Sequence, residues 1–298
     1  MRNSVIPHSE LHTPHFPSDI LLLSLTLPRG CATVPSVLRE RLQSVRQRIR
    51  QACERSGRPP SSVTLVGVTK GVAVGTIQEA VAIGLTDLGE NRVQEARQKQ
   101  EALGSRLKAP GASLQPPASS LQPVRWHLIG HLQRNKAREA VELFHVIHSV
   151  DTLELIDTLE HQAAKLAQGS GLEARGKDTT ASLEVFVQVN MSGEETKFGC
   201  LVTEALPLAR AILQRPHLRL RGLMTLAPFS EKSEDARPHF RRLRQLRDDL
   251  AVALSLEPSA LSLSMGMSQD FEVAIEEGAD IVRVGTAIFG TRDMRQET

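Results

Sequence analysis

Residues 63–70 read VTLVGVTK, an apolar run rich in β-branched side chains that ends on a threonine and a lysine. Such a run is typical of a strand that is buried on both faces of a parallel sheet. Residues 76–84 follow with apolar side chains at helical spacing, and the same alternation continues through most of the chain. Strands that alternate with helices predict parallel pairing through right-handed crossovers.

Eight strands can be placed in this way, most of them separated by helical patterns. The expected strands are 63–68, 87–88, 126–129, 146–149, 183–189, 220–224, 261–263 and 281–284. The expected helices are 76–84, 93–103, 135–143, 152–168, 203–213, 234–256 and 269–277. Eight units favour a single closed (β/α)8 barrel of the TIM type, an α/β fold, over an open doubly wound sheet.

The chain before the first strand divides into two parts. Residues 1–34 contain several prolines and show no helical or strand period, so we expect a disordered extension. From Val37 onward, apolar side chains recur at helical spacing, which predicts an amphipathic helix ahead of the barrel. The barrel domain is therefore expected to span residues 35–298. Two low-complexity segments, 104–123 and 169–180, fall between a helix and the next strand, away from the active end of such a barrel.

Composition excludes several classes of partner. The formal net charge is only +2 and the basic residues are spread along the chain, which argues against nucleic acid. No stretch reaches the roughly 20 apolar residues that a membrane helix needs, so no membrane partner is expected. Cys31, Cys53 and Cys200 lie far apart without C-x-x-C spacing, which favours a reducing compartment. We expect a cytoplasmic monomer.

Lys70 stands two residues beyond the first expected strand, at the end of a TIM-type barrel where chemistry takes place. A lysine that is partly buried among strand ends is suited to act as the amine of a Schiff base. A solvated loop lysine would occupy the same position in the sequence. The position of Lys70 alone therefore leaves both interpretations open.

Small and hydroxyl residues follow the last two strands. SMGMS at 264–268 follows the seventh, and Gly285 and Thr286 follow the eighth. In this fold the loops after these strands often bind phosphate through backbone N–H groups and the start of a short helix. Ser268, Gly285 and Thr286 suit such a site, because hydroxyl groups donate hydrogen bonds and glycine lets the backbone approach. The eighth strand closes against the first, which places this cradle beside Lys70, as pyridoxal 5′-phosphate (PLP) requires.

Arg283, in the eighth strand, has two interpretations. PLP proteins place either a carboxylate or an arginine against the pyridine nitrogen. A permanently charged guanidinium there makes the cofactor a weaker electron sink than a carboxylate does. A surface salt bridge to Asp280 or Glu277 would explain the same residue, and the sequence favours neither interpretation.

His127, His131 and Asn91 are polar residues with competing interpretations. His127 and His131 are four residues apart, a spacing that binds metal when both lie on a helix. The run WHLIGH at 126–131 instead predicts a strand and a glycine turn, so no metal site is expected. Asn91, after the second strand, is either a hydrogen-bond partner for a ring substituent or a helix cap, and capping is the simpler interpretation.

These motifs together resemble those of the PLP homeostasis proteins, the YggS/PROSC-like family, which is related to the barrel domain of bacterial alanine racemase. The motifs are VTK at 68–70, GEN at 89–91, WHLIGHLQ at 126–133, NMSGEETKFG at 190–199, GLMT at 222–225, LSMGMS at 263–268 and VRVGT at 282–286. They run in order over nearly all of the chain except the extension and the inserts. Each motif is modest alone, and their combination is highly specific.

The resemblance implies that the chain holds PLP as a Schiff base on Lys70. It also implies phosphate contacts from Ser268, Gly285 and Thr286, and a contact between Arg283 and the pyridine nitrogen. The full set of expected cofactor-binding residues is Lys70, Asn91, Ser264, Met267, Ser268, Arg283, Gly285 and Thr286. Members of this family are thought to buffer or deliver PLP without an established turnover. PLP-dependent apoenzymes are therefore expected partners, and no enzymatic reaction is expected.

Two positions depart from the family pattern, because Gly71 follows the lysine and Arg92 stands where a tyrosine is usual. Two other functions stay open from the sequence. An amino-acid racemase would use the same cofactor, although the chain contains no tyrosine to act as a second base and is expected to end without a second domain. A barrel for another phosphorylated metabolite would use Lys70 only as an electrostatic contact.

Overall fold

The computed structural model describes residues 36–107, 124–168, 182–194 and 197–291. These residues belong to one compact unit, Pro35–Thr298. The predicted extension 1–34 and the predicted insert 169–180 lie outside the described residues, as does most of the insert 104–123.

Eight parallel strands close into a barrel in which each strand pairs with its neighbour in the sequence. The strands are β1 Thr64–Val68, β2 Asp87–Glu90, β3 Arg125–Leu128, β4 Val146–Val150, β5 Leu183–Gln188, β6 Leu218–Met224, β7 Ser262–Ser264 and β8 Ile281–Val284. β1 pairs with β2 on one side and with β8 on the other, which closes the ring. The predicted (β/α)8 barrel is confirmed.

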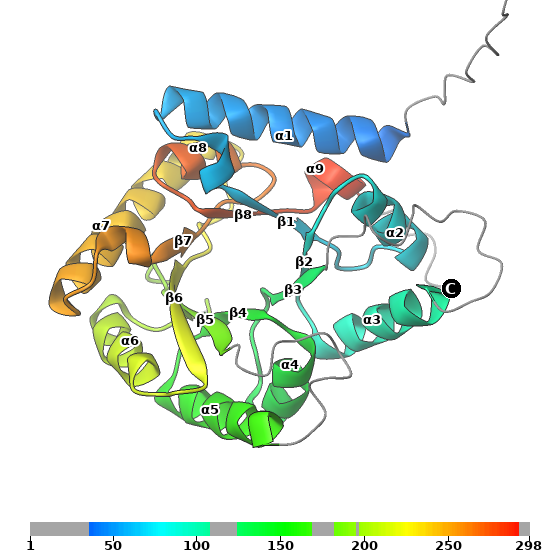
Figure 1. Cartoon of the computed structure of the whole chain (residues 1–298). Helices are drawn as coiled ribbons and strands as arrows, with labels where there is room; N and C mark the ends of the chain where they lie inside the picture. The colour runs from blue at the N-terminus through cyan, green and yellow to red at the C-terminus, as the bar shows by residue number, and fades with distance from the viewer. Residues whose placement is uncertain (1–35, 108–123, 169–181, 195–196, 292–298) are drawn as a thin grey trace, which may run out of the picture. The chain divides into compact units, whose positions relative to one another are not determined.

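The helices surround the ring of strands (Figure 1). They are α1 Val37–Arg55, α2 Val74–Ala82, α3 Val93–Leu107, α4 Ala137–Leu143, α5 Leu153–Gln168, α6 Ala205–Leu213, α7 Arg237–Ala253, α8 Phe271–Glu276 and α9 Thr286–Phe289. The predicted amphipathic helix is α1, whose buried face begins at Leu38 and Leu42 and whose first turn is capped by the Ser36 hydroxyl. It packs against α8 and α9 outside the seam between β8 and β1 (Figure 1).

Several predicted boundaries differ from the structure by one to four residues. α3 continues through Gly104 to Leu107, because one glycine weakens a helix without ending it. The segment predicted as one long helix from residue 234 begins as a 3-10 turn, Ser233–Ala236, before α7. β6 begins two residues earlier than expected, at Leu218, where it pairs with β5.

The barrel interior holds a cluster of five buried apolar side chains from β1, β4, β5, β6 and β8. They are Val66, Val146, Phe186, Met224 and Ile281. A second and larger core lies between the strands and the surrounding helices. The apolar cluster leaves the inward positions nearer the mouth to polar side chains such as Arg283, which follows Ile281 by two residues on β8.

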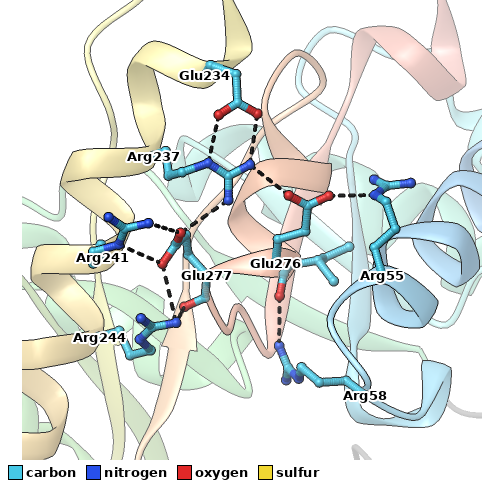
Figure 2. A network of polar contacts seen from close by, with 9 residues as sticks. Arg55, Arg58, Glu234, Arg237, Arg241, Arg244, Glu276 and Glu277 are labelled. Carbon is cyan, nitrogen blue, oxygen red and sulfur yellow. Dashed lines mark hydrogen bonds and ion pairs between the residues drawn. The ribbon is translucent and has the colours of Figure 1, made fainter.

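Outside the barrel, arginines from α7 and α1 meet two glutamates at the end of α8 (Figure 2). Glu277 accepts from Arg237, Arg241 and Arg244 at 3.0–3.3 Å. Glu276 accepts from Arg237 and from Arg55 of α1, each at 2.7 Å. We call these residues the α7–α8 arginine network, and it fastens α7 and α1 to α8.

No helix in the part of the chain that the structure describes is long and apolar enough to cross a membrane.

Candidate functional site

A pocket of about 300 Å³ opens at the mouth of the barrel, where the carboxyl ends of all eight parallel strands lie. It lies among the loops that follow β6, β7 and β8, with Val68 at the end of β1. Five of the eight predicted site residues line it, namely Met267, Ser268, Arg283, Gly285 and Thr286. Its size falls at the lower end of the range for small-molecule sites, about 300–1,000 Å³.

The predicted phosphate cradle is built from two loops that touch. The Ser268 hydroxyl accepts hydrogen bonds from the backbone N–H groups of Gly285 at 3.2 Å and Ala287 at 3.4 Å. A side chain at Gly285 would press on Val68, since a Cβ there would lie 3.3 Å from the Val68 Cβ. Backbone N–H groups and a hydroxyl therefore converge at the start of α9, a chemistry that suits an anion.

Gly266 shapes the loop that carries Ser268. Its φ of +94° lies in the region that favours glycine, and a Cβ there would lie 2.6 Å from the Ala274 Cβ. Asp270 completes the turn by accepting from the Met267 N–H at 2.6 Å, and burial raises the pKa of this carboxyl. The conformation of Gly266 and the hydrogen bond to Asp270 together hold the loop, which places Met267 and Ser268 at the pocket.

Arg283 is buried, with 3% of its surface exposed. It donates from Nη1 to the Ser264 hydroxyl at 2.6 Å and from Nη2 to the Thr225 carbonyl at 2.9 Å. Burial lowers the pKa of Arg283 to about 10, so the side chain stays cationic at neutral pH. The surface salt bridge considered from the sequence is wrong, because Asp280 pairs with Arg58 and Glu277 belongs to the α7–α8 arginine network.

Lys70 lies at the mouth beside this pocket but does not line it. It follows Val68, which contacts Gly285 across the seam. Of the two interpretations left open by the sequence, the structure shows the solvated one, because the Lys70 side chain is exposed. No hydrogen bond or ion pair to the Lys70 side chain is found among the described residues, so its amine is available to a ligand.

The backbone on either side of Lys70 is anchored by buried charges that the sequence did not reveal. Lys99 of α3 donates to the Thr69 carbonyl at 2.5 Å and to Glu90 at 2.6 Å. The Thr69 hydroxyl donates to the same Glu90 carboxylate, whose pKa is raised by burial. These contacts fix the chain immediately before Lys70.

Gly71 explains one of the two departures from the family pattern. Its φ of +67° turns the backbone directly after Lys70, and its N–H donates to Glu95 at 2.5 Å. Arg92, the other departure, is exposed between β2 and α3, and nothing in the structure explains it.

Four further residues that the sequence analysis named do not line the pocket. Ser264 is buried and contacts Arg283 and His148 instead of lining the pocket. Asn91 is half-buried and stands two residues before α3, which begins at Val93. His131 stacks on Phe198 with ring centroids 4.0 Å apart, whereas His127 points into the barrel.

A series of hydrogen-bonded polar side chains inside the barrel was not identified from the sequence. Asp87, His127, His148 and Ser264 are linked by successive contacts of 2.9–3.0 Å, and Ser264 then contacts Arg283. We call this series of hydrogen-bonded side chains the interior chain. A usable signal was present, since His127 and His148 interrupt otherwise apolar strands.

Comparisons with known proteins place this barrel among relatives. Residues 41–293 match the family model "Alanine racemase, N-terminal domain". The chain is 40% identical over 253 residues to the pyridoxal phosphate homeostasis protein of Aquifex aeolicus, covering 85% of this chain and 97% of that one. It is 40% identical over 258 residues to the protein of the same name from Pseudomonas aeruginosa, covering 87% and 97% of the two chains.

A solved structure agrees with these relatives. PipY of Synechococcus elongatus with PLP bound superposes with a TM-score of 0.64 at 33% identity, over 85% of this chain and 100% of that one. The family predicted from the motifs is confirmed, and this chain belongs to the pyridoxal phosphate homeostasis proteins.

Proposed function

We propose that this chain holds PLP at the mouth of the barrel as a Schiff base on Lys70, and acts in PLP homeostasis. The observation that carries the proposal is an exposed lysine without a partner in the described residues, beside a pocket lined by a hydroxyl and N–H cradle and a buried guanidinium. The PLP-bound structure of PipY supports the choice of ligand.

Different residues are assigned to different parts of the cofactor. Ser268, Gly285 and Thr286 supply donors for the phosphate. Arg283 lines the pocket with N–H groups left over from its two hydrogen bonds, and we assign these to the pyridine nitrogen. A bound PLP supplies an electron-withdrawing ring, and the cationic arginine weakens that property because it disfavours protonation of the nitrogen.

This arrangement suits storage better than turnover. The names of the relatives describe homeostasis of the cofactor and no reaction. We therefore propose a cytoplasmic, monomeric protein that gives PLP to apoenzymes, with no nucleic acid or membrane among its partners. Cys53 and Cys200 support a reducing compartment, because both are buried free thiols.

The decisive experiment is borohydride reduction of the PLP-loaded protein followed by peptide mapping. We expect a pyridoxyl adduct on Lys70, and complete loss of the near-visible absorbance band in Lys70→Ala with the fold intact. The matched control is Lys136→Ala, because Lys136 pairs with Glu139 away from the pocket and its loss should leave the band unchanged. An adduct mainly on another lysine would contradict the assignment.

The racemase alternative is tested by deuterium exchange at the α-carbon of L- and D-alanine in heavy water. Two-base racemisation needs a proton donor on each face of the α-carbon, and the chain contains no tyrosine to serve the second face. We expect no exchange at the rate of an ordinary enzyme. Turnover at about 1 per second or faster would establish the racemase instead.

A further inference from the structure

The interior chain reaches across the barrel from one end to the other. Asp87 is the first residue of β2, at the end away from the mouth, and Arg283 lies at the pocket. Between them, Asp87 Oδ1 contacts His127 Nε2 at 3.0 Å, His127 Nδ1 contacts His148 Nε2 at 3.0 Å, and His148 Nδ1 contacts the Ser264 Oγ at 2.9 Å.

The two ends of the chain fix the direction of every hydrogen bond. A guanidinium can only donate, so the Ser264 oxygen accepts from Arg283, and when both imidazoles are neutral its own hydrogen passes to His148 Nδ1. A carboxylate can only accept, so His127 carries its hydrogen on Nε2, toward Asp87. His148 then donates from Nε2 to His127 Nδ1, and each imidazole is neutral with one donor and one acceptor in use.

The electrostatic surroundings agree with this assignment. Burial lowers the pKa of both His127 and His148, which keeps the imidazoles neutral. Burial alone would raise the pKa of Asp87, but the hydrogen bonds from His127 and Thr86 outweigh it and hold the pKa below its usual value. Among the described residues, Arg283 has no carboxylate in direct contact. Asp270 is the carboxylate that acts on it electrostatically, and Asp87 ends the interior chain on the opposite side.

We propose that Asp87, His127, His148 and Ser264 are positioning residues, a one-way hydrogen-bond chain that fixes the guanidinium of Arg283 at the pocket. The role assigned to Arg283 rests on the proposed function, whereas the direction of the chain does not. A chain that only satisfied buried polar groups would leave the recognition of the pyridine nitrogen unchanged when it was cut.

The first test uses the protein without PLP. Nitrogen-15 NMR at neutral pH should show His127 and His148 as neutral imidazoles with hydrogen on Nε2. A cationic imidazole, or hydrogen on Nδ1 of either residue, would overturn the chain. Because no cofactor is present, this result is independent of whether the proposed function is correct.

The second test cuts the chain at its centre. His148→Phe keeps the stacking on Phe186, whose ring centroid lies 4.6 Å away, and removes both hydrogen bonds. We expect PLP to bind roughly 10–150-fold more weakly, the scale of one lost hydrogen bond to a charged group. An analogue of PLP with carbon in place of the ring nitrogen should bind equally well to both proteins. The matched control is His161→Phe on the exposed side of α5.

Two further variants keep the test decisive. In an Arg283→Gln background, His148→Phe should cause no additional loss of PLP, because its effect passes through the guanidinium. Asp87→Asn removes the distant charge at almost constant shape and should weaken PLP binding roughly 2–5-fold. Equal losses for PLP and its carbon analogue would make the chain merely structural and refute the proposal. If neither compound binds the unaltered protein, the proposed function fails while the NMR result stands.

Discussion

The protein holds two polar networks of opposite design, one inside the barrel and one between its outer helices. In the interior chain, each member has one neighbour on either side, and His127 and His148 are almost fully buried. In the α7–α8 arginine network, three guanidinium groups share Glu277, and their exposed fractions range from 25% to 62% (Figure 2).

The difference lies in what happens when a member is lost. Among the described residues, His127 and His148 each have only their two partners in the interior chain, so one deletion leaves buried donors or acceptors unsatisfied. The outer network is redundant, and solvent reaches most of its members. The same kinds of polar contact are therefore expected to contribute very differently to the free energy of unfolding.

The largest effect is expected from cutting the interior chain. His148→Phe leaves the Ser264 hydroxyl hydrogen and His127 Nδ1 without partners, at about 1–3 kcal/mol for each buried group. The free energy of unfolding should fall by about 2–4 kcal/mol in urea titrations. A loss below about 0.5 kcal/mol, the scale of an ordinary surface change, would mean that the two networks do not differ in this way.

The two networks should lose their contributions to the free energy of unfolding at different pH values. The unfolded chain binds a proton at each of His127 and His148 near pH 6.5, whereas the folded protein binds it only at lower pH. Their contribution to stability is therefore complete above pH 6.5 and falls as the pH drops below it, by at most about 1.4 kcal/mol per pH unit for each histidine.

Urea midpoints at pH 7.5, 6.5 and 5.5 measure this slope. The double variant His127→Phe/His148→Phe should show a flatter profile in the same range. Burial alone would raise the pKa of Glu277, but Arg241 and Arg237 hold it below its usual value of 4.5. The outer network should therefore weaken only in stronger acid, and a slope that persists in the double variant would assign the pH 6.5 window to other groups.

A smaller loss is expected from Glu277→Gln, which removes the charge that three arginines share. We expect about 1–2 kcal/mol in low salt, because hydrogen bonds to charged groups are replaced by weaker ones. The loss should shrink in 1 M sodium chloride, where the screening length is about 3 Å. Glu231→Gln is the control, since Glu231 is exposed and no ion pair is found for it among the described residues.

The smallest effects on the free energy of unfolding are expected for substitutions of Arg55 and Lys70. Arg55→Ala should cost less than about 1 kcal/mol, because Arg55 is 53% exposed and Glu276 keeps its contact with Arg237. Lys70→Ala should change the free energy of unfolding by less than about 0.5 kcal/mol. A thermal melt that shows strong destabilisation by Lys70→Ala would reveal a structural contact and weaken the reading of Lys70 as a free amine.

Periodicity and strand order made the barrel predictable from the sequence. Because every strand end of a parallel barrel lies at one mouth, the sequence also indicated that Lys70 and the loop with Gly285 are neighbours. The exposure of Lys70 was not predictable, because it depends on how the turn at Gly71 directs the backbone.

The interior chain shows what remained beyond sequence reasoning. His127 was considered for metal together with His131, its neighbour in the sequence, whereas its actual partners, Asp87 and His148, lie on adjacent strands. Which inward side chains meet depends on the stagger between strands, and the sequence does not specify that stagger.

The pairing of β1 with β8 determines when, during synthesis of the protein, the pocket can form. Lys70 is made early, but Arg283 and the loop with Gly285 follow more than two hundred residues later. A ribosome must therefore deliver nearly the whole barrel before the two halves of the pocket can meet. Binding at a site built from both ends of the barrel then follows synthesis, and a ligand that contacts both Lys70 and the loop with Gly285 would reinforce the contact that forms last.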